Sequence, residues 1–161
     1  KLENNFERIE FEQYMSIIDV KCSNNNTLLL MNNGDIFQKN GHVFELLNDR
    51  IYIRPKIYSD INICYILYEG SNNVKYIARL NRNLIVHEVL EYDIETLVVG
   101  FDTIFFISMN DVYCQGNNKY GDLGLGHNKS IDYPTLHPFL TREKLLIIPQ
   151  RNNIKRAIYE N

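Results

Sequence analysis

Four histidines are the residues of this chain best suited to general acid–base chemistry, because an imidazole changes its charge near neutral pH. They lie far apart in the sequence, and none adjoins a nucleophile motif such as Gly-x-Ser-x-Gly, which the chain lacks. We interpret them as ordinary residues of strands and loops, and we expect the protein not to be an enzyme. They are His42, His87, His127 and His137.

Three cysteines are the next candidates, either as metal ligands or as reactive thiols. Cys22, Cys64 and Cys114 show no Cys-x-x-Cys spacing, whereas a zinc site takes about four cysteine or histidine ligands in close pairs. The residues after Lys1 are charged and rich in asparagine rather than leader-like. An odd number of cysteines then favours free thiols in a reducing compartment. We expect no metal site, and a cytoplasmic or nuclear protein.

A glycine-rich stretch raises the question of phosphate binding. Gly116 and Gly121 have the first spacing of a P-loop, but Asp122 and Leu123 stand where that loop needs Lys and Ser or Thr. An aspartate at this position would repel the phosphate. We expect neither a nucleotide nor another cofactor.

Residues 141–161 are rich in positive charge, because they contain five basic residues and only two acidic ones, Glu143 and Glu160. Such a segment can contact nucleic-acid phosphates or a partner, although a solvated tail is the alternative interpretation. The formal charge of the whole chain is −3, so we expect nucleic-acid contact only through this segment. The candidate contacts are Arg142, Lys144, Arg151, Lys155 and Arg156.

The composition predicts strands as the elements that position these residues. The 161 residues are 45% hydrophobic and 23% charged, which is typical of a globular domain. Alanine occurs twice, whereas isoleucine occurs 20 times and tyrosine 11 times, and this favours strands over helices. Asparagine occurs 21 times, often in doublets that are typical of turns, although a biased genome would also produce them. No apolar run approaches the roughly 18 residues of a membrane helix, so we expect no membrane contact.

Short apolar runs between these turns predict antiparallel meanders. Asn32-Asn33-Gly34 is typical of a hairpin turn. Residues 1–17 form an acidic lead-in whose apolar spacing fits either a short helix or a strand. The expected strands are Val20–Cys22, Thr27–Met31, Asp35–Gln38, Val43–Leu47, Ile61–Tyr68, Val74–Leu80, Leu84–Leu90, Glu95–Val99, Thr103–Met109, Asp111–Gln115 and Thr135–Leu140.

An internal repeat runs through the predicted strands. Residues 20–38 align with residues 97–115 when Gly34 alone is deleted, and a weaker unit fits between them. Units of about 40 residues have the length of a four-stranded propeller blade. We expect a repeat domain over residues 18–161, with units 18–56, 57–93 and 94–140 and a partial unit 141–161.

The most specific motif occupies residues 111–126. It resembles the repeat signature of the regulator of chromosome condensation family, in which a strand ending Val-Tyr-x-Trp-Gly precedes x-Asn-x-x-Gly-x-Leu-Gly-x-Gly and a proline-containing strand. Gln115 and Asp122 depart from the family's usual Trp and Gln, and residues 22–37 match the preceding half-motif less closely. The matching residues are Val112, Tyr113, Gly116, Asn118, Gly121, Leu123, Gly124, Gly126 and Pro134.

We interpret this motif as structural. Its glycines allow positive φ angles, and at least one of them is expected to adopt one. Leu123 and Leu125 are expected to lie between blades, while the Asn118 amide binds loop backbone.

The resemblance implies an all-β fold, here a partial or incomplete β-propeller of about three to four four-stranded antiparallel blades. It also implies a non-catalytic protein-interaction module. Two alternatives stay open. The first is a guanine nucleotide exchange factor for a Ran-type small GTPase, although the positions critical for exchange lie outside the repeat signature. The second is a structural or binding subunit of a larger ribonucleoprotein or scaffold complex.

Closure of the ring is a separate expectation. Propellers have four to eight blades, and three units with a fragment would leave an open arc. Residues 153–161 resemble the first strand of a further blade. We therefore expect the chain to be part of a longer protein, or to be completed by a partner or a second copy.

Overall fold

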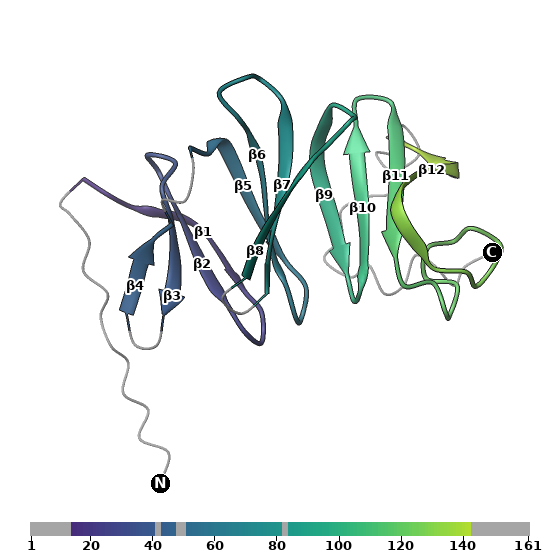
Figure 1. Cartoon of the computed structure of the whole chain (residues 1–161), viewed down its shortest axis with the longest axis horizontal. Coiled ribbons are helices and arrows are strands. Elements are labelled where there is room, and N and C mark those ends of the chain that lie inside the picture. Colours follow the sequence, from purple (N-terminus) through teal and green to yellow (C-terminus); the bar gives the residue numbers. More distant parts are fainter. Residues whose placement is uncertain (1–13, 41–42, 48–50, 82–83, 143–161) are drawn as a thin grey trace, which may run out of the picture.

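The computed structural model describes residues 14–40, 43–47, 51–81 and 84–142, and the elements in these residues are all β-strands. Figure 1 shows three four-stranded antiparallel sheets that follow one another along the chain. The first sheet contains β1 (Ile17–Cys22), β2 (Thr27–Met31), β3 (Ile36–Asn40) and β4 (Val43–Leu46). The second contains β5 (Ile53–Ser59), β6 (Cys64–Glu69), β7 (Lys75–Asn81) and β8 (Leu84–Val89). The third contains β9 (Ile94–Gly100), β10 (Thr103–Ser108), β11 (Asp111–Gly116) and β12 (Ile131–Thr141).

Each sheet is a meander, because strands adjacent in sequence are hydrogen-bonded neighbours. The turn between β2 and β3 explains why short polar segments suffice to connect them. Gly34 adopts φ 91° and its backbone N–H donates to the Met31 carbonyl over 3.0 Å. The side chain of Asn33 accepts the backbone N–H of Asp35 over 3.0 Å. The predicted hairpin turn is therefore confirmed.

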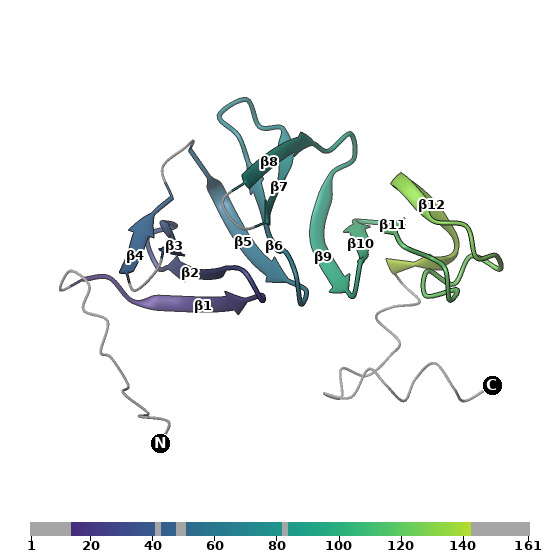
Figure 2. The ribbon, with the colours of Figure 1, turned by 60° about the horizontal axis from the view of Figure 1, so that its bottom comes forward.

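Two hydrophobic cores hold the sheets face to face. Side chains alternate along each strand, so the second sheet packs one face on the first sheet and the other face on the third. In addition, β5 contacts both β1 and β9, so the leading strands of the three sheets are neighbours, like the inner strands of propeller blades. Figure 2 shows the sheets in succession from a second direction. The first core includes Leu28, Leu30, Ile36, Ile66, Tyr68 and Leu80, and the second includes Tyr65, Leu67, Ile77, Leu97, Ile104 and Phe106.

This architecture confirms the predicted all-β fold of propeller-type blades, three of which lie in the described residues. One strand, β5, was not predicted. It contains Pro55, a residue that is rare within strands and that hides the strand pattern in the sequence. Arg54, before the proline, has φ 49°. The pairing of β5 with β6 shifts register between Ile53 and Lys56, and a proline is tolerated there because β5 is the first strand of its sheet. The unit boundary expected at 56/57 falls inside β5, whereas the sheets span residues 17–46, 53–89 and 94–141.

Several expectations lie outside the described residues. They concern residues 1–13 of the acidic lead-in, His42, four of the five basic candidates and the strand-like segment 153–161. Among the described residues, no helix is long and apolar enough to cross a membrane. The three cysteine thiols are unpaired: Cys22 is exposed, whereas Cys64 and Cys114 are buried. Burial raises the pKa of the Cys64 and Cys114 thiols.

Candidate interaction site

The connection between β11 and β12, residues 117–130, is the longest between described strands and carries most of the repeat signature. We call it the repeat loop. Asn118 organises it from a fully buried position. Its Oδ1 accepts the backbone N–H of Leu123 over 2.9 Å, and its Nδ2 donates to the His127 carbonyl over 2.6 Å. One side chain thus satisfies backbone groups on both arms of the loop, as an asparagine of this kind can.

The glycines of the repeat loop allow two successive turns. The N–H of Gly121 donates to the Asn118 carbonyl, and the N–H of Gly124 donates to the Gly121 carbonyl, each over 2.9 Å. Gly121, Gly124 and Gly126 all have positive φ, between 66° and 80°. The turns bring Leu123 into a buried position, whereas Leu125 stays half-buried. Of the two leucines expected between blades, the structure buries only Leu123 completely.

His137 fastens the repeat loop to β12. Its Nδ1 accepts the backbone N–H groups of Phe139 and Leu140 over 3.1 and 3.0 Å, so the ring proton lies on Nε2. Nε2 then donates to the Leu123 carbonyl over 2.9 Å. Both ring nitrogens of this buried histidine are occupied by backbone, which gives it a structural role.

Gly116, the last residue of β11, allows its backbone to approach the β9–β10 turn closely. It has φ 127°, and a Cβ on it would lie 2.2 Å from the Asp102 carbonyl oxygen. The next residue, Asn117, donates its backbone N–H to the same carbonyl over 2.9 Å. Only glycine permits this approach without displacement of the backbone. The other signature residues surround this point: Val112 is fully buried, Tyr113 stacks on Tyr92 at 4.0 Å, and Pro134 lies in β12.

A cleft of about 510 Å³ opens between the second and third sheets, beside the base of the repeat loop. It lies at the end of the sheets where the β5–β6 and β9–β10 turns are found. Both walls carry polar side chains among apolar ones such as Ile63 and Ile104. The second sheet contributes Asp60, Tyr65 and Arg79, and the third contributes Asp102, Gln115 and Asp132.

Arg79 crosses the cleft. Its Nη2 donates to Gln115 Oε1 over 2.8 Å and to Glu88 Oε2 over 3.2 Å, so it links the two sheets. Gln115 in turn donates from Nε2 to the Asp132 carbonyl over 2.5 Å. Among the described residues, neither the buried Nε of Arg79 nor its Nη1 has an acceptor.

The carboxylates of the cleft fall into two groups. Asp60 is used internally: Oδ1 accepts the backbone N–H groups of Asn62 and Ile63, and Oδ2 accepts the Tyr65 hydroxyl over 3.1 Å. Burial, together with the charge of Asp60, raises the pKa of Tyr65 above its ordinary value. By contrast, the exposed carboxylates of Asp102 and Asp132 bind no side chain or backbone group in the described part of the chain. Asp102 also has a positive φ of 52°.

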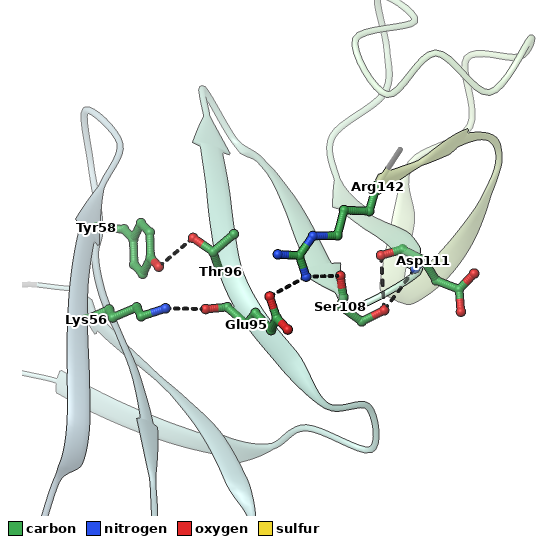
Figure 3. A network of polar contacts seen from close by, with 7 residues as sticks. All are labelled: Lys56, Tyr58, Glu95, Thr96, Ser108, Asp111 and Arg142. Carbon is green, nitrogen blue, oxygen red and sulfur yellow. Dashed lines mark hydrogen bonds and ion pairs between the residues drawn. The ribbon is translucent and has the colours of Figure 1, made fainter. Parts of the chain in front are cut away.

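The opposite end of the same two sheets is closed by a polar network, which Figure 3 shows. Lys56 donates to the Glu95 carbonyl over 2.6 Å, and the hydroxyls of Tyr58 and Thr96 lie 2.9 Å apart. The Glu95 carboxylate pairs with the Arg142 guanidinium, which also reaches the Ser108 carbonyl. Arg142, a candidate for phosphate contact, therefore has partners inside the third sheet.

The other two histidines of the described ranges also have partners. Nδ1 of His87 lies 2.9 Å from the Tyr68 hydroxyl, and Nδ1 of the exposed His127 accepts the backbone N–H of Lys129 over 3.1 Å. In the described ranges, no group of three or more His, Cys, Asp or Glu side chains is arranged to hold a metal ion.

Sequence reasoning missed the cleft. Its polar residues named above come from the β5–β6 turn, β6, β7, the β9–β10 turn, β11 and β12, so no local motif contains them. The one available signal was Gln115, which stands where the repeat signature usually has a large apolar tryptophan.

The repeat loop and the strands on either side of it match a known family model. Residues 110–146 match the family model of the regulator of chromosome condensation (RCC1) repeat. The match covers β11, the repeat loop and β12, which includes the signature residues and Gln115. A comparison with curated proteins gave no match.

Proposed function

We propose that this chain, with its RCC1 repeat, is a non-catalytic protein-interaction module whose cleft between the second and third sheets receives a protein partner. The observation that carries the proposal is a buried N–H group without an acceptor, Nε of Arg79, beside a cleft where the exposed carboxylates of Asp102 and Asp132 make no bond within the described residues. Buried polar groups of folded proteins are normally hydrogen-bonded, so an unpaired buried N–H needs an explanation, and we infer that a bound partner provides it. A concave site on which several polar side chains converge is also a common starting hypothesis for a binding site.

The state of the histidines supports a role without acid–base chemistry. Ring nitrogens of His87, His127 and His137 are held by other groups of the same chain, and His137 has both nitrogens occupied. The unpaired cysteines fit a reducing compartment, so we propose a cytoplasmic or nuclear location.

Site-specific photocrosslinking tests the proposal. We would place a benzophenone amino acid at Asn117, which is exposed on the rim of the cleft, and in a second variant at Met109, which is exposed in the β10–β11 turn at the other end. We expect a discrete crosslinked protein from position 117 and not from position 109. An excess of unlabelled chain should abolish the crosslink. Equal labelling from both positions, or none from position 117, would contradict the proposal.

Exchange activity stays a prediction of the family resemblance. It is measured by the release of fluorescent GDP from a Ran-type small GTPase in the presence of a stoichiometric amount of this chain. Accelerated release would replace a passive module with an exchange factor. A crosslinked partner that contains RNA-binding subunits would instead favour the scaffold alternative.

A further inference from the structure

The register of the strands makes the first two sheets directly comparable. β2 begins at Thr27, paired with Cys22, and β6 begins at Cys64, paired with Ser59. The four-residue turns before these strands are closed by the same hydrogen bond, from Ser23 N to Asn26 O over 2.8 Å and from Asp60 N to Ile63 O over 3.0 Å. Asn26 and Ile63 are therefore equivalent positions.

The same comparison pairs Gln38 with Arg79. Leu28 is opposite Gln38 in the first sheet, and Tyr65, one residue into β6 as Leu28 is into β2, is opposite Arg79 in the second. Each of these two sheets thus directs one long polar side chain from its third strand toward the next sheet, beside the last residue of its first turn.

Between the first and second sheets, the side chain at this turn position, Asn26, forms hydrogen bonds to both sheets. Asn26 is 5% exposed, and its Oδ1 accepts Nε2 of Gln38 over 2.7 Å. Its Nδ2 donates across the interface to the Leu80 carbonyl over 3.1 Å. A carboxamide therefore joins the long polar side chain of one sheet to the backbone of the next.

Between the second and third sheets the carboxamide is replaced by the hydrocarbon side chain of Ile63. Nη2 of Arg79 donates hydrogen bonds to Gln115 and Glu88, but its Nε and Nη1 have no acceptor among the described residues. The interface widens here into the cleft, which Ile63 helps to line. The second interface thus has no carboxamide at the turn position that Asn26 occupies in the first, and Arg79 itself reaches across to the Gln115 side chain.

The charges around the cleft decide which group can take this place. Asp60, Asp102 and Asp132 outnumber Arg79, so a carboxylate would meet net repulsion. A basic side chain would be attracted by Asp102 and Asp132, but it has no acceptor to offer the N–H groups of Arg79. A neutral carboxamide meets both requirements, because its oxygen accepts from Arg79 and its nitrogen donates to an aspartate.

We propose that the cleft recognises a glutamine or asparagine side chain on an extended segment of the partner protein, held between Arg79 and the Asp102 and Asp132 carboxylates. This inference rests on the proposed function, since it names the chemistry of the segment that the cleft receives. The cleft, at about 510 Å³, holds more than one side chain, so neighbouring residues of the segment would enter with it.

A titration of the full chain tests the inference directly. The probe is the acetylated and amidated tripeptide Gly-Gln-Gly, and the readout is the Nε–Hε signal of Arg79 in heteronuclear NMR spectra. We expect a saturable shift of this signal. The matched tripeptides Gly-Met-Gly and Gly-Glu-Gly should bind roughly tenfold more weakly, because each loses a hydrogen bond to a charged group or adds repulsion.

Two variants localise the effect. Ile63→Asn supplies the carboxamide that Asn26 supplies in the first interface, and it should weaken the glutamine probe roughly tenfold by occupying Arg79 internally. Arg79→Met should abolish the probe-dependent shifts of neighbouring signals. The control, Arg54→Met, removes an arginine of the same sheet that is 82% exposed, and it should leave probe binding unchanged.

The inference is overturned if the wild-type chain shows no saturable shift, or if the glutamate probe binds as tightly as the glutamine probe. These outcomes leave the proposed function in place when position 117 still crosslinks a partner. Conversely, probe binding without any crosslink from position 117 would contradict the proposed function while supporting carboxamide recognition.

Discussion

The two ends of the interface between the second and third sheets use the same kinds of side chain for different purposes. At the network end of Figure 3, Lys56, Glu95 and Arg142 all have partners, and the sheets are joined by direct bonds. At the cleft end, Arg79 makes one such bond to the third sheet, while Asp102 and Asp132 make none to described residues. When the polar groups of an interface are paired at one end and unpaired at the other, the interface can hold its sheets in place and still bind a partner.

This comparison assigns stability to the network end and binding to the cleft end, with Gly116 as the expected exception. Gly116→Ala should cost the most, about 3 kcal/mol of unfolding free energy, because its Cβ would meet the Asp102 carbonyl at 2.2 Å in a backbone conformation with φ 127°. Chemical denaturation measures the loss. The matched control is Gly126→Ala, which has φ 75° and no atom within 4 Å of its Cβ, and which should lose only about 1 kcal/mol. Equal losses would show that close approach is not what Gly116 provides.

The network end is tested by Glu95→Gln, which removes the charge facing Arg142. Both side chains are about a third exposed, so we expect a loss of roughly 1 kcal/mol or less, with no change in probe or partner binding. Glu91→Gln is the control, since Glu91 is exposed, lies four residues before Glu95 in the chain and has no ion pair with the described residues. A loss of binding in Glu95→Gln would break the division between the two ends.

The cleft end is tested by the stability of Arg79→Met. We expect a change in unfolding free energy within about 0.5 kcal/mol, because the variant loses two hydrogen bonds but also removes a buried N–H that has no acceptor. Thermal unfolding beside Arg54→Met gives the measurement. A large destabilisation would show that Arg79 is a structural residue. The cleft end would then contribute to stability, as the network end does.

The smallest effect at neutral pH is expected from the titration of Tyr65. Burial and Asp60 raise its pKa in the folded state, so the unfolded chain releases this proton first as the pH rises. Stability should therefore be unaffected at neutral pH and should fall above about pH 10, the ordinary pKa of tyrosine. Melting temperatures of wild type and Tyr65→Phe across this range provide the test, with a shallower decline expected in the variant. Parallel curves would show that Tyr65 does not couple to folding.

The sequence predicted the parts of this molecule that depend on local patterns. The turn at Gly34, a positive φ in at least one signature glycine, which all four in fact adopt, and the loop-organising Asn118 each follow from residues within a few positions of one another. β5 escaped prediction because Pro55 and the register shift beside it hide the alternation of its side chains. The cleft escaped for a different reason. Arg79 and Asp102 meet only through the packing of two sheets, and that packing is recorded in no single segment.

Because the three cysteines differ in burial, their reactivity can report which part of the fold opens first. Cys22 is exposed at the end of β1, Cys64 lies in the first core, and Cys114 is buried in the third sheet. A thiol reagent under native conditions should label Cys22 at once and the other two only when their surroundings separate from the rest of the fold. The rates at Cys64 and Cys114 would then measure, in one unmodified molecule, whether the arc breaks first between its opening pair of sheets or at the sheet that carries the repeat loop.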